Sequence, residues 1–264
     1  MDGTFFEIFE LKDFPFDHQE VSAKLRCICA MEGAVPVKFT GLYNAVEVVD
    51  VDNFALQNTW TLEKRLEVTE DEVSPMEGRT YPVLIFTAHV NRHFGFYVWN
   101  VALPMSMLSL AAFLQFEVDE QDVADRASIS LTLLLTAVAY KLVTAGMVPT
   151  ISYLTLLDKF VSACIMLMLA LVLEVGFTNE LTRLGLMEWT GKNERITVWL
   201  CFSVWELIHV WFAAKAYRTR RELLEERAKR EVDHLQEEES RGKTYQRGVI
   251  QRHASVSGSE TEMH

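Results

Sequence analysis

The sequence predicts an α+β membrane protein, in which part of a β-sandwich is followed by a four-helix transmembrane bundle and a charged helical tail. Three observations predict this fold class. Residues 1–93 contain short β-branched runs, residues 94–217 hold four long apolar runs, and residues 218–264 are dominated by charged and polar side chains. The overall charged content of 23% conceals this separation along the chain.

The first region has the pattern of a β-sandwich. Runs rich in β-branched residues, at 34–39, 45–49 and 81–90, are separated by Gly, Pro and Asn residues that favour turns. A complete sandwich of this kind has about 100 residues. Residues 1–93 are fewer than that, so we expect only part of a sandwich.

Four apolar runs follow, and each is long enough for a helix of about 20 residues to cross the hydrocarbon core of a bilayer. The predicted spans cover about residues 94–116, 127–148, 155–175 and 196–217. The first has no charged side chain, and its aromatic residues gather at one end, as in an interfacial belt. Buried helices of a soluble core are the alternative, but four such runs in a row favour a membrane bundle.

Among the ionisable side chains within these spans, Lys141, Glu206 and His209 each have two interpretations. Lys141 either extends to the membrane interface or faces a neighbouring subunit. Glu206 and His209 are one helical turn apart. They form either a proton-sensitive site, since histidine titrates near neutral pH, or a satisfied structural pair.

The tail, residues 218–264, is of a different composition. Oppositely charged residues at i,i+4 spacing, such as Glu225 with Lys229, favour a solvated helix that continues the fourth span. From about residue 242 the chain is polar, and we predict disorder there.

Composition excludes several classes of function. The net charge of −12 argues against nucleic acid as a partner. Two of the four cysteines, Cys164 and Cys201, lie in apolar runs and are expected to pack as small core residues. Cys27 and Cys29 have no partners at metal-ligand spacing. No nucleophile–base set or phosphate-binding loop is present, so we predict no enzyme activity, no cofactor and no metal site.

The second span carries a stripe of mixed polarity along one helical face, with spacings of three and four residues. Its hydroxyls lie at the end next to Asp125, and apolar or small residues lie at the other. The stripe consists of Ser128, Thr132, Leu135, Ala139, Leu142 and Gly146. Such a face suits a narrow water column, in which Leu135 closes the pore and Asp125 concentrates cations at the mouth. A helix–helix interface is the alternative, because Ser and Thr often join spans.

Several stretches, in order, resemble the Cys-loop receptor superfamily of pentameric ligand-gated ion channels. Residues 14–19, FPFDHQ, resemble the signature loop, and Arg92 resembles the arginine that precedes the first span. Pro104 matches a proline within that span. Residues 124–140 resemble the pore helix, and residues 148–158 resemble the linker into the third span. The resemblance extends over residues 5–212.

The chain also departs from the animal receptors. Glu7 and Val21 occupy the positions of their paired cysteines, which places the chain nearer the bacterial and protist-like members that lack the disulfide. Strands expected before the signature loop are absent, and no signal peptide is recognisable. We therefore expect an N-terminally truncated chain. Residues 74–82 take the place of the pocket-capping loop, where Tyr81 is the one aromatic and a weak ligand-binding candidate.

The resemblance implies a multi-pass membrane protein of the cell membrane that is a subunit of a pentameric, cation-selective channel. It makes residues 1–93 the C-terminal part of an extracellular ligand-binding sandwich and residues 94–217 the pore domain. The residues implied to couple the two are Phe14, Pro15, Phe16, Asp17, Arg92, Pro149 and Tyr153. The expected partners are like subunits in a homo- or hetero-pentamer, membrane lipid, permeant monovalent cations, and an unknown small-molecule agonist or protons.

Two alternatives keep the membrane bundle but change the function. A chain that lacks part of its sandwich is also compatible with a silent or dominant-negative channel subunit. A non-channel membrane scaffold, using its charged tail to recruit partners, is the second. Two arguments place the tail on opposite sides of the membrane. The resemblance puts it outside the cell, whereas Lys215, Arg218 and Arg220 favour the cytoplasm by the positive-inside rule.

Overall fold

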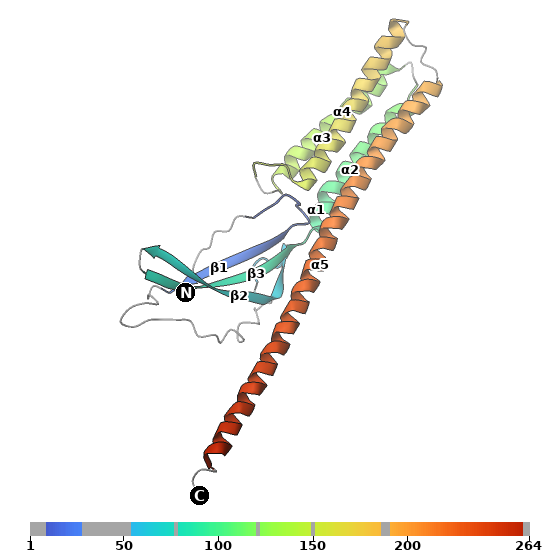
Figure 1. Cartoon of the computed structure of the whole chain (residues 1–264). Helices are drawn as coiled ribbons and strands as arrows, with labels where there is room; N and C mark the ends of the chain where they lie inside the picture. Colours follow the sequence, from blue (N-terminus) through green and yellow to red (C-terminus); the bar gives the residue numbers. More distant parts are fainter. Residues whose placement is uncertain are drawn as a thin grey trace. The chain divides into compact units, whose positions relative to one another are not determined.

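The computed structural model describes residues 9–27, 54–76, 79–119, 122–148, 151–185 and 191–260. The chain forms two units, Met1–Ala216 and Tyr217–His264. The first contains an antiparallel sheet and a group of long helices (Figure 1). Among the described residues, four helical segments are long and apolar enough to cross a membrane. The predicted fold class, an α+β multi-pass membrane protein, is confirmed.

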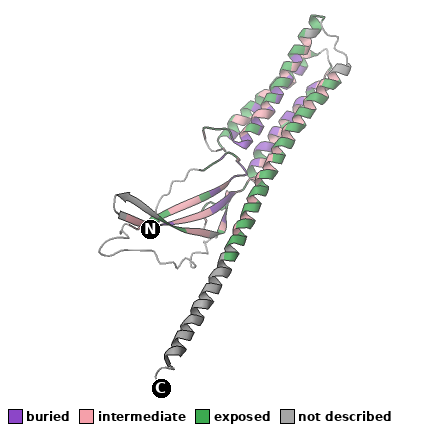
Figure 2. Ribbon diagram, in the orientation of Figure 1, coloured by how far each residue is buried: buried purple, intermediate pink, exposed green. Residues whose placement is uncertain are grey.

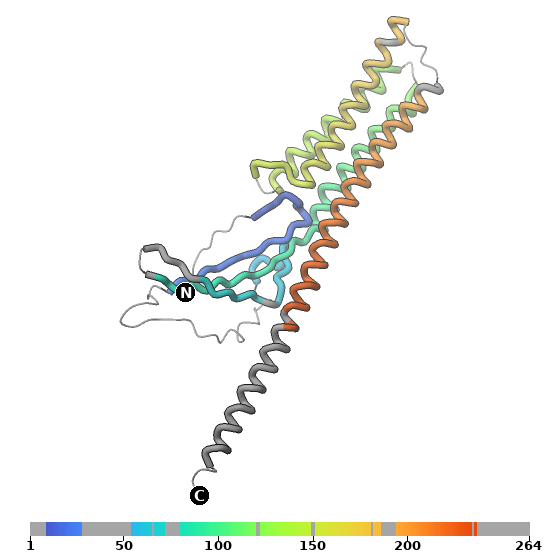
Figure 3. Tube along the Cα trace, in the orientation of Figure 1, coloured from blue at the N-terminus to red at the C-terminus, as the bar shows by residue number. Residues whose placement is uncertain are grey.

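Within the described part of the chain, the sheet has three antiparallel strands in the order β1-β3-β2. They are β1 (His18–Arg26), β2 (Trp60–Met76) and β3 (Arg79–Arg92). Figure 3 shows the trace of β1 running alongside β3. The register places His18 opposite Asn91 and Trp60 opposite Arg92. Both outer strands therefore begin where β3 ends, at the entry to the first span.

The run predicted at 81–90 lies in β3, whereas the runs at 34–39 and 45–49 lie outside the described residues. The long strand β2 was not predicted, because its many Glu, Asp and Lys residues have low strand propensity. Pairing with β3 along most of its length offsets that preference. A small buried cluster of Trp60, Leu62 and Val90 fixes which face of the sheet is covered.

The first span, Gly95–Glu117, changes its helical geometry along its length. It comprises α1 (Gly95–Tyr97), the π-helical turn η2 (Val98–Ala102), α2 (Leu103–Ala111) and the 3₁₀ turn η3 (Ala112–Glu117). Pro104 lies in the first turn of α2 and has no N–H to bond the carbonyl of Asn100 four residues earlier. The Tyr140 hydroxyl donates to that carbonyl instead. A neighbouring helix thus satisfies the backbone group that proline leaves open inside the membrane.

The other three spans lie in α3 (Val123–Ala145), α4 (Leu156–Arg183) and α5 (Gly191–Glu260). The apolar segments Val123–Ala145, Leu156–Glu180 and Glu194–Asp233 agree with the predicted spans to within a few residues, except at the end of the last one. Thr155 and Asp158 form a capping box that begins α4. Buried side chains, purple in Figure 2, lie along α2 and α4, among them Met105, Phe160 and Leu171.

The second unit is helical where we predicted disorder. The structure continues α5 through Gly242 to Glu260. A single glycine costs a helix only about 1 kcal/mol. Charged pairs one turn apart, such as Arg221 with Glu225 at 2.7 Å, favour the helix. The polar composition at residue 242 therefore does not mark the end of the helix.

Candidate functional site

The stripe on α3 lies opposite the side by which that helix packs in its own chain. The buried residues of α3 are Arg126, Ser130, Ala137 and Thr144. Since successive residues turn by about 100° around a helix, the stripe lies on the far side from this set. All of the stripe residues from Ser128 to Gly146 are exposed, and Leu135 and Leu142 are 70% and 73% exposed.

Two threonine hydroxyls on or beside the stripe are oriented by the helix backbone. Thr132 donates to the carbonyl of Ser128, four residues earlier, at 2.7 Å. Thr136, beside the stripe, donates to the carbonyl of Thr132 in the same way. Because these two hydroxyl hydrogens point into the helix, the oxygen lone pairs remain directed outward. This face offers oxygen acceptors, which suit a partly dehydrated cation.

The charges at the start of α3 point in different directions. Asp125 is exposed in the first turn, whereas its neighbour Arg126 is buried. The Arg126 guanidinium donates to Glu194 on α5 at 2.5 Å and to the carbonyl of Val118 at 2.6 Å. Its positive charge is therefore paired inside the helical bundle. Asp125 therefore presents an exposed carboxylate at this end of the stripe.

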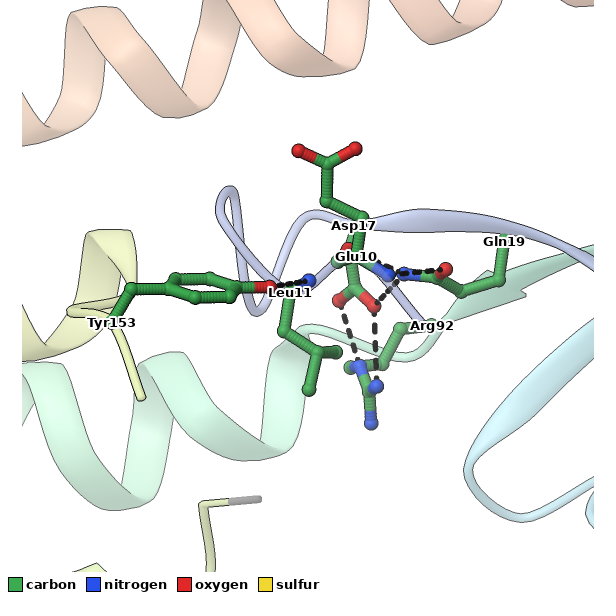
Figure 4. Close-up of polar contacts among 6 residues, drawn as sticks. All are labelled: Glu10, Leu11, Asp17, Gln19, Arg92 and Tyr153. Carbon is green, nitrogen blue, oxygen red and sulfur yellow. Dashed lines mark hydrogen bonds and ion pairs between the residues drawn. The ribbon is translucent and has the colours of Figure 1, made fainter. Parts of the chain in front are cut away.

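A second group of predicted residues joins the sheet to the helices through a buried ion pair (Figure 4). Arg92, at the end of β3, donates through Nε to Asp17 Oδ1 at 2.7 Å and through its terminal nitrogen to Oδ2 at 3.1 Å. The two side chains are 6% and 2% exposed. Gln19 donates to the same carboxylate at 2.9 Å and also bonds the backbone of Glu10. This two-point geometry fixes the loop before β1 against the start of the first span.

Aromatic rings surround the Arg92 guanidinium. Its central carbon lies 4.0 Å from the centroid of Trp60 and 4.8 Å from that of Phe14. Phe14 is fully buried and packs edge-to-face on Tyr97 in the first span, with centroids 4.6 Å apart. The cation is thus held away from water on both sides by ring faces, which strengthens its attraction to the carboxylate.

The same loop contacts the start of α4. The Tyr153 hydroxyl accepts from the backbone N–H of Leu11 at 2.8 Å. The first N–H groups of α4, at Leu156 and Leu157, donate to the carbonyls of Lys12 and Phe14 at 3.1 and 3.3 Å. These N–H groups have no partners within a helix. The loop therefore caps the N-terminus of α4.

Of the remaining predicted coupling residues, Pro15 and Phe16 lie in the same junction. Pro15 is buried, and Phe16 packs on Phe94 and on Phe212 of α5 with centroids 5.2 and 6.2 Å apart. Pro149 lies outside the described residues. Tyr81 is half-buried in β3 opposite Val73, far along the strand from Arg92.

Lys141 and His209 inside the spans have partners on other helices. Lys141 donates to Ser162 on α4 at 3.0 Å. His209 contacts the Ser106 hydroxyl and the Trp205 carbonyl at 3.0 and 2.8 Å and packs edge-to-face against Phe160. The expected partner Glu206 is exposed, because it lies on another face of α5. His209 is thus satisfied by the first span rather than by the carboxylate on its own helix.

Sequence reasoning missed two residues that support these sites. Glu194 pairs with Arg126 from 68 positions away, and Gln19 supports Asp17 from two positions along the chain, in β1. A lone glutamate at the start of an apolar run was a usable signal for Glu194, because a charge entering a membrane helix needs a partner. The backbone partners of Tyr153 leave no comparable trace in the sequence.

No protein-family model matches the chain. The chain is similar to receptor subunits among curated proteins. It is 25% identical to gamma-aminobutyric acid receptor subunit alpha-2 of Bos taurus, over 69% of this chain and 40% of that protein. It is 22% identical to subunit beta of Lymnaea stagnalis, over 65% of this chain and 34% of that protein. It is 29% identical to gamma-aminobutyric acid receptor subunit epsilon of Rattus norvegicus, over 50% of this chain and 27% of that protein. The chain thus matches less than half the length of these relatives.

Proposed function

We propose that this chain is a subunit of a pentameric ligand-gated ion channel, with α3 lining the pore. The observation that carries the proposal is the uncovered stripe on α3, opposite the face by which this helix packs in its own chain. Hydroxyl oxygens near Asp125 and the apolar ring of Leu135 are the elements that a gated ion pathway needs. The similarity to receptor subunits supports the same assignment.

The loop around Asp17 is the element through which the sheet would act on the pore. In this proposal residues 1–93 belong to an extracellular agonist-binding region, residues 94–217 form the pore domain and residues 218–264 are a tail. Agonist binding would move the loop that Arg92 holds. Because the loop also caps α4 and contacts Tyr153, its movement would shift the α3–α4 connection and widen the constriction at Leu135.

A cross-linking experiment tests the pore assignment without any agonist. Ala139 and Ala137 are the same residue type on one helix, but Ala139 is exposed on the stripe and Ala137 is fully buried. Ala139→Cys, treated in membranes with a short bifunctional maleimide, is expected to give covalent dimers, because each thiol reacts once and joins two subunits. Ala137→Cys and the unchanged chain should not give these dimers. A lysine-reactive cross-linker, which finds several sites on each chain, should give a ladder that ends at five subunits. A lysine ladder ending at two, or equal dimer yields from both cysteine variants, contradicts a pentamer with the stripe on its axis.

Selectivity is expected to depend on Asp125. Five copies would place a ring of carboxylates at the mouth, and each attracts a monovalent cation by about 1 kcal/mol at 4 Å in water. Asp125→Asn should therefore lower the cation-to-anion permeability ratio by roughly tenfold or more. The measurement is the reversal potential in diluted NaCl, taken on the agonist-independent current expected of Leu135→Thr. Asp125→Glu, which keeps the charge, is the control. An unchanged reversal potential, or an anion-selective current in the parent, rejects this role.

A further inference from the structure

A cluster of metal-binding side chains lies on the sheet, where the sequence predicted none. His18 and Glu20 lie two apart on β1, and the register places Glu20 opposite His89 of β3. Residues two apart share a face of a strand, and paired residues share it too. The three side chains therefore lie on one face, although β1 and β3 are far apart in the sequence. Their possible ligand atoms all lie within 4.8 Å of one another.

The separations match the edges of a tetrahedral metal site. His18 Nε2 lies 3.3 Å from His89 Nδ1, and His89 Nδ1 lies 3.7 Å from Glu20 Oε1. Zinc binds imidazole nitrogen and carboxylate oxygen at about 2.0–2.2 Å, so tetrahedral ligand atoms lie about 3.3–3.6 Å apart. An ion can enter between these three atoms with small side-chain adjustments. Glu20 is 61% exposed, which leaves a path for the ion and for a water ligand.

Oxygen atoms lie near the outer nitrogens of both rings. His18 Nδ1 lies 2.9 Å from Asn91 Oδ1, and Glu63 accepts from the Asn91 amide nitrogen at 3.2 Å, which sets the amide orientation. His89 Nε2 lies 3.2 Å from Glu67 Oε1, but the two are not aligned for a hydrogen bond. A carboxylate or carbonyl behind the ring is the usual second shell of a zinc-bound histidine.

The inner nitrogens face each other within hydrogen-bond distance, at 3.3 Å. His18 and His89 stack with an interplanar angle of 12° and centroids 5.3 Å apart. Without a metal, one ring donates a proton to the other across this gap, and a metal ion held by both nitrogens would take the place of that proton. His89 is 4% exposed, so water does not solvate this arrangement from its side.

We propose that His18, Glu20 and His89 bind a divalent transition-metal ion of the zinc class, with water as the fourth ligand. Two imidazoles and one carboxylate suit Zn²⁺ and exclude Ca²⁺ and Mg²⁺, which prefer oxygen ligands only. The ion bridges β1 to β3 beside the buried ion pair. His18 follows Asp17 in the sequence and pairs with Asn91, which precedes Arg92. It therefore joins the two strands that carry the buried ion pair. Resting on the proposed function, the bound ion regulates gating by restraining this junction.

Metal binding is tested on the full chain, purified in detergent and stripped with a chelator. Addition of Co²⁺ is expected to produce the visible absorption bands of a tetrahedral site, and Zn²⁺ should displace it at one ion per chain. Glu20→Gln, on an exposed side chain, should weaken binding by roughly 10- to 100-fold while the fold is kept. Glu70→Gln, an exposed glutamate on β2, is the matched control and should bind as the parent does.

Substitution of the buried ligand completes the test. His89→Gln should abolish the Co²⁺ bands, and its folding is checked by circular dichroism without metal. Co²⁺ bands that survive Glu20→Gln and His18→Asn unchanged, or no bands in the parent, overturn the site. In the latter case the two inner nitrogens share a proton rather than a metal ion.

The regulatory role has its own readout. Micromolar Zn²⁺ should change the agonist-independent current of Leu135→Thr, and Glu20→Gln should remove that response. Binding without any change of current overturns the link to gating but not the metal site. Absence of current in every variant counts against the proposed channel, and the Co²⁺ titration still decides the site.

Discussion

Replacement of Leu135 by threonine is expected to give a standing current without agonist. Leu135 is 70% exposed at the middle of the stripe, between the hydroxyl end at Ser128 and the small residues at Gly146. In a pentamer, five leucine side chains would form an apolar ring narrow enough to exclude water. A hydroxyl at each position lowers the cost of hydrating the ring, so the open, water-filled state becomes populated without ligand.

The measurement is voltage clamp of cells that express the variant, with surface labelling to establish delivery. Replacement of sodium by a large impermeant cation should reduce the current if the pathway selects cations. Leu134→Thr is the matched control, because this neighbour is half-buried and packs against the core rather than on the stripe. It should give no standing current.

Silence of Leu135→Thr despite good surface labelling would contradict the gate. Cross-linking through lysines then separates the alternatives. A ladder ending at five with no current indicates a silent subunit, whose co-expression with a conducting relative should reduce that relative's current. No ladder indicates a membrane scaffold.

The parts of the molecule that depend on local periodicity could be predicted from the sequence. The stripe from Ser128 to Gly146 follows from the 3.6-residue turn of one helix, and its exposure agrees with a face that does not pack in its own chain. The span boundaries follow from apolar length. Pro104 could be recognised in the sequence. The Tyr140 hydroxyl, which donates to the Asn100 carbonyl that Pro104 leaves without an N–H partner, could not.

The parts that depend on contacts between distant residues could not. His18 and His89 are 71 positions apart, and only the register of β1 on β3 brings them together. Arg126 lies next to Asp125 in the sequence, and periodicity alone does not show that one charge is buried against Glu194 while the other is exposed. The family resemblance indicated that Asp17 and Arg92 act at the same junction. Their pairing and its burial required the fold.

Loss of either partner of the Asp17–Arg92 pair is expected to destabilise the chain by about 3–5 kcal/mol, because the remaining charge is buried without its counter-ion. Asp17→Asn keeps the shape and can still accept from Gln19, and Arg92→Gln removes the guanidinium. The double variant leaves no unpaired charge. Its loss of stability should therefore be clearly smaller than the sum of the two single losses.

The free energies are measured from thermal unfolding of the purified chains, as a double-mutant cycle. Asp13→Asn is the control for an ion pair in the same loop. Asp13 lies 3.4 Å from Lys215, but these side chains are 38% and 44% exposed, so its loss should cost only about 0–1 kcal/mol. Additive losses in the Asp17 and Arg92 cycle would mean that the two side chains do not interact as the structure places them. A coupled cycle would show that Asp17 and Arg92 interact. If the standing current of Leu135→Thr also persists when Asp17→Asn is added, the junction is separate from the pore. The contact between sheet and helices would then be weakened while the gate and the ion pathway remain intact.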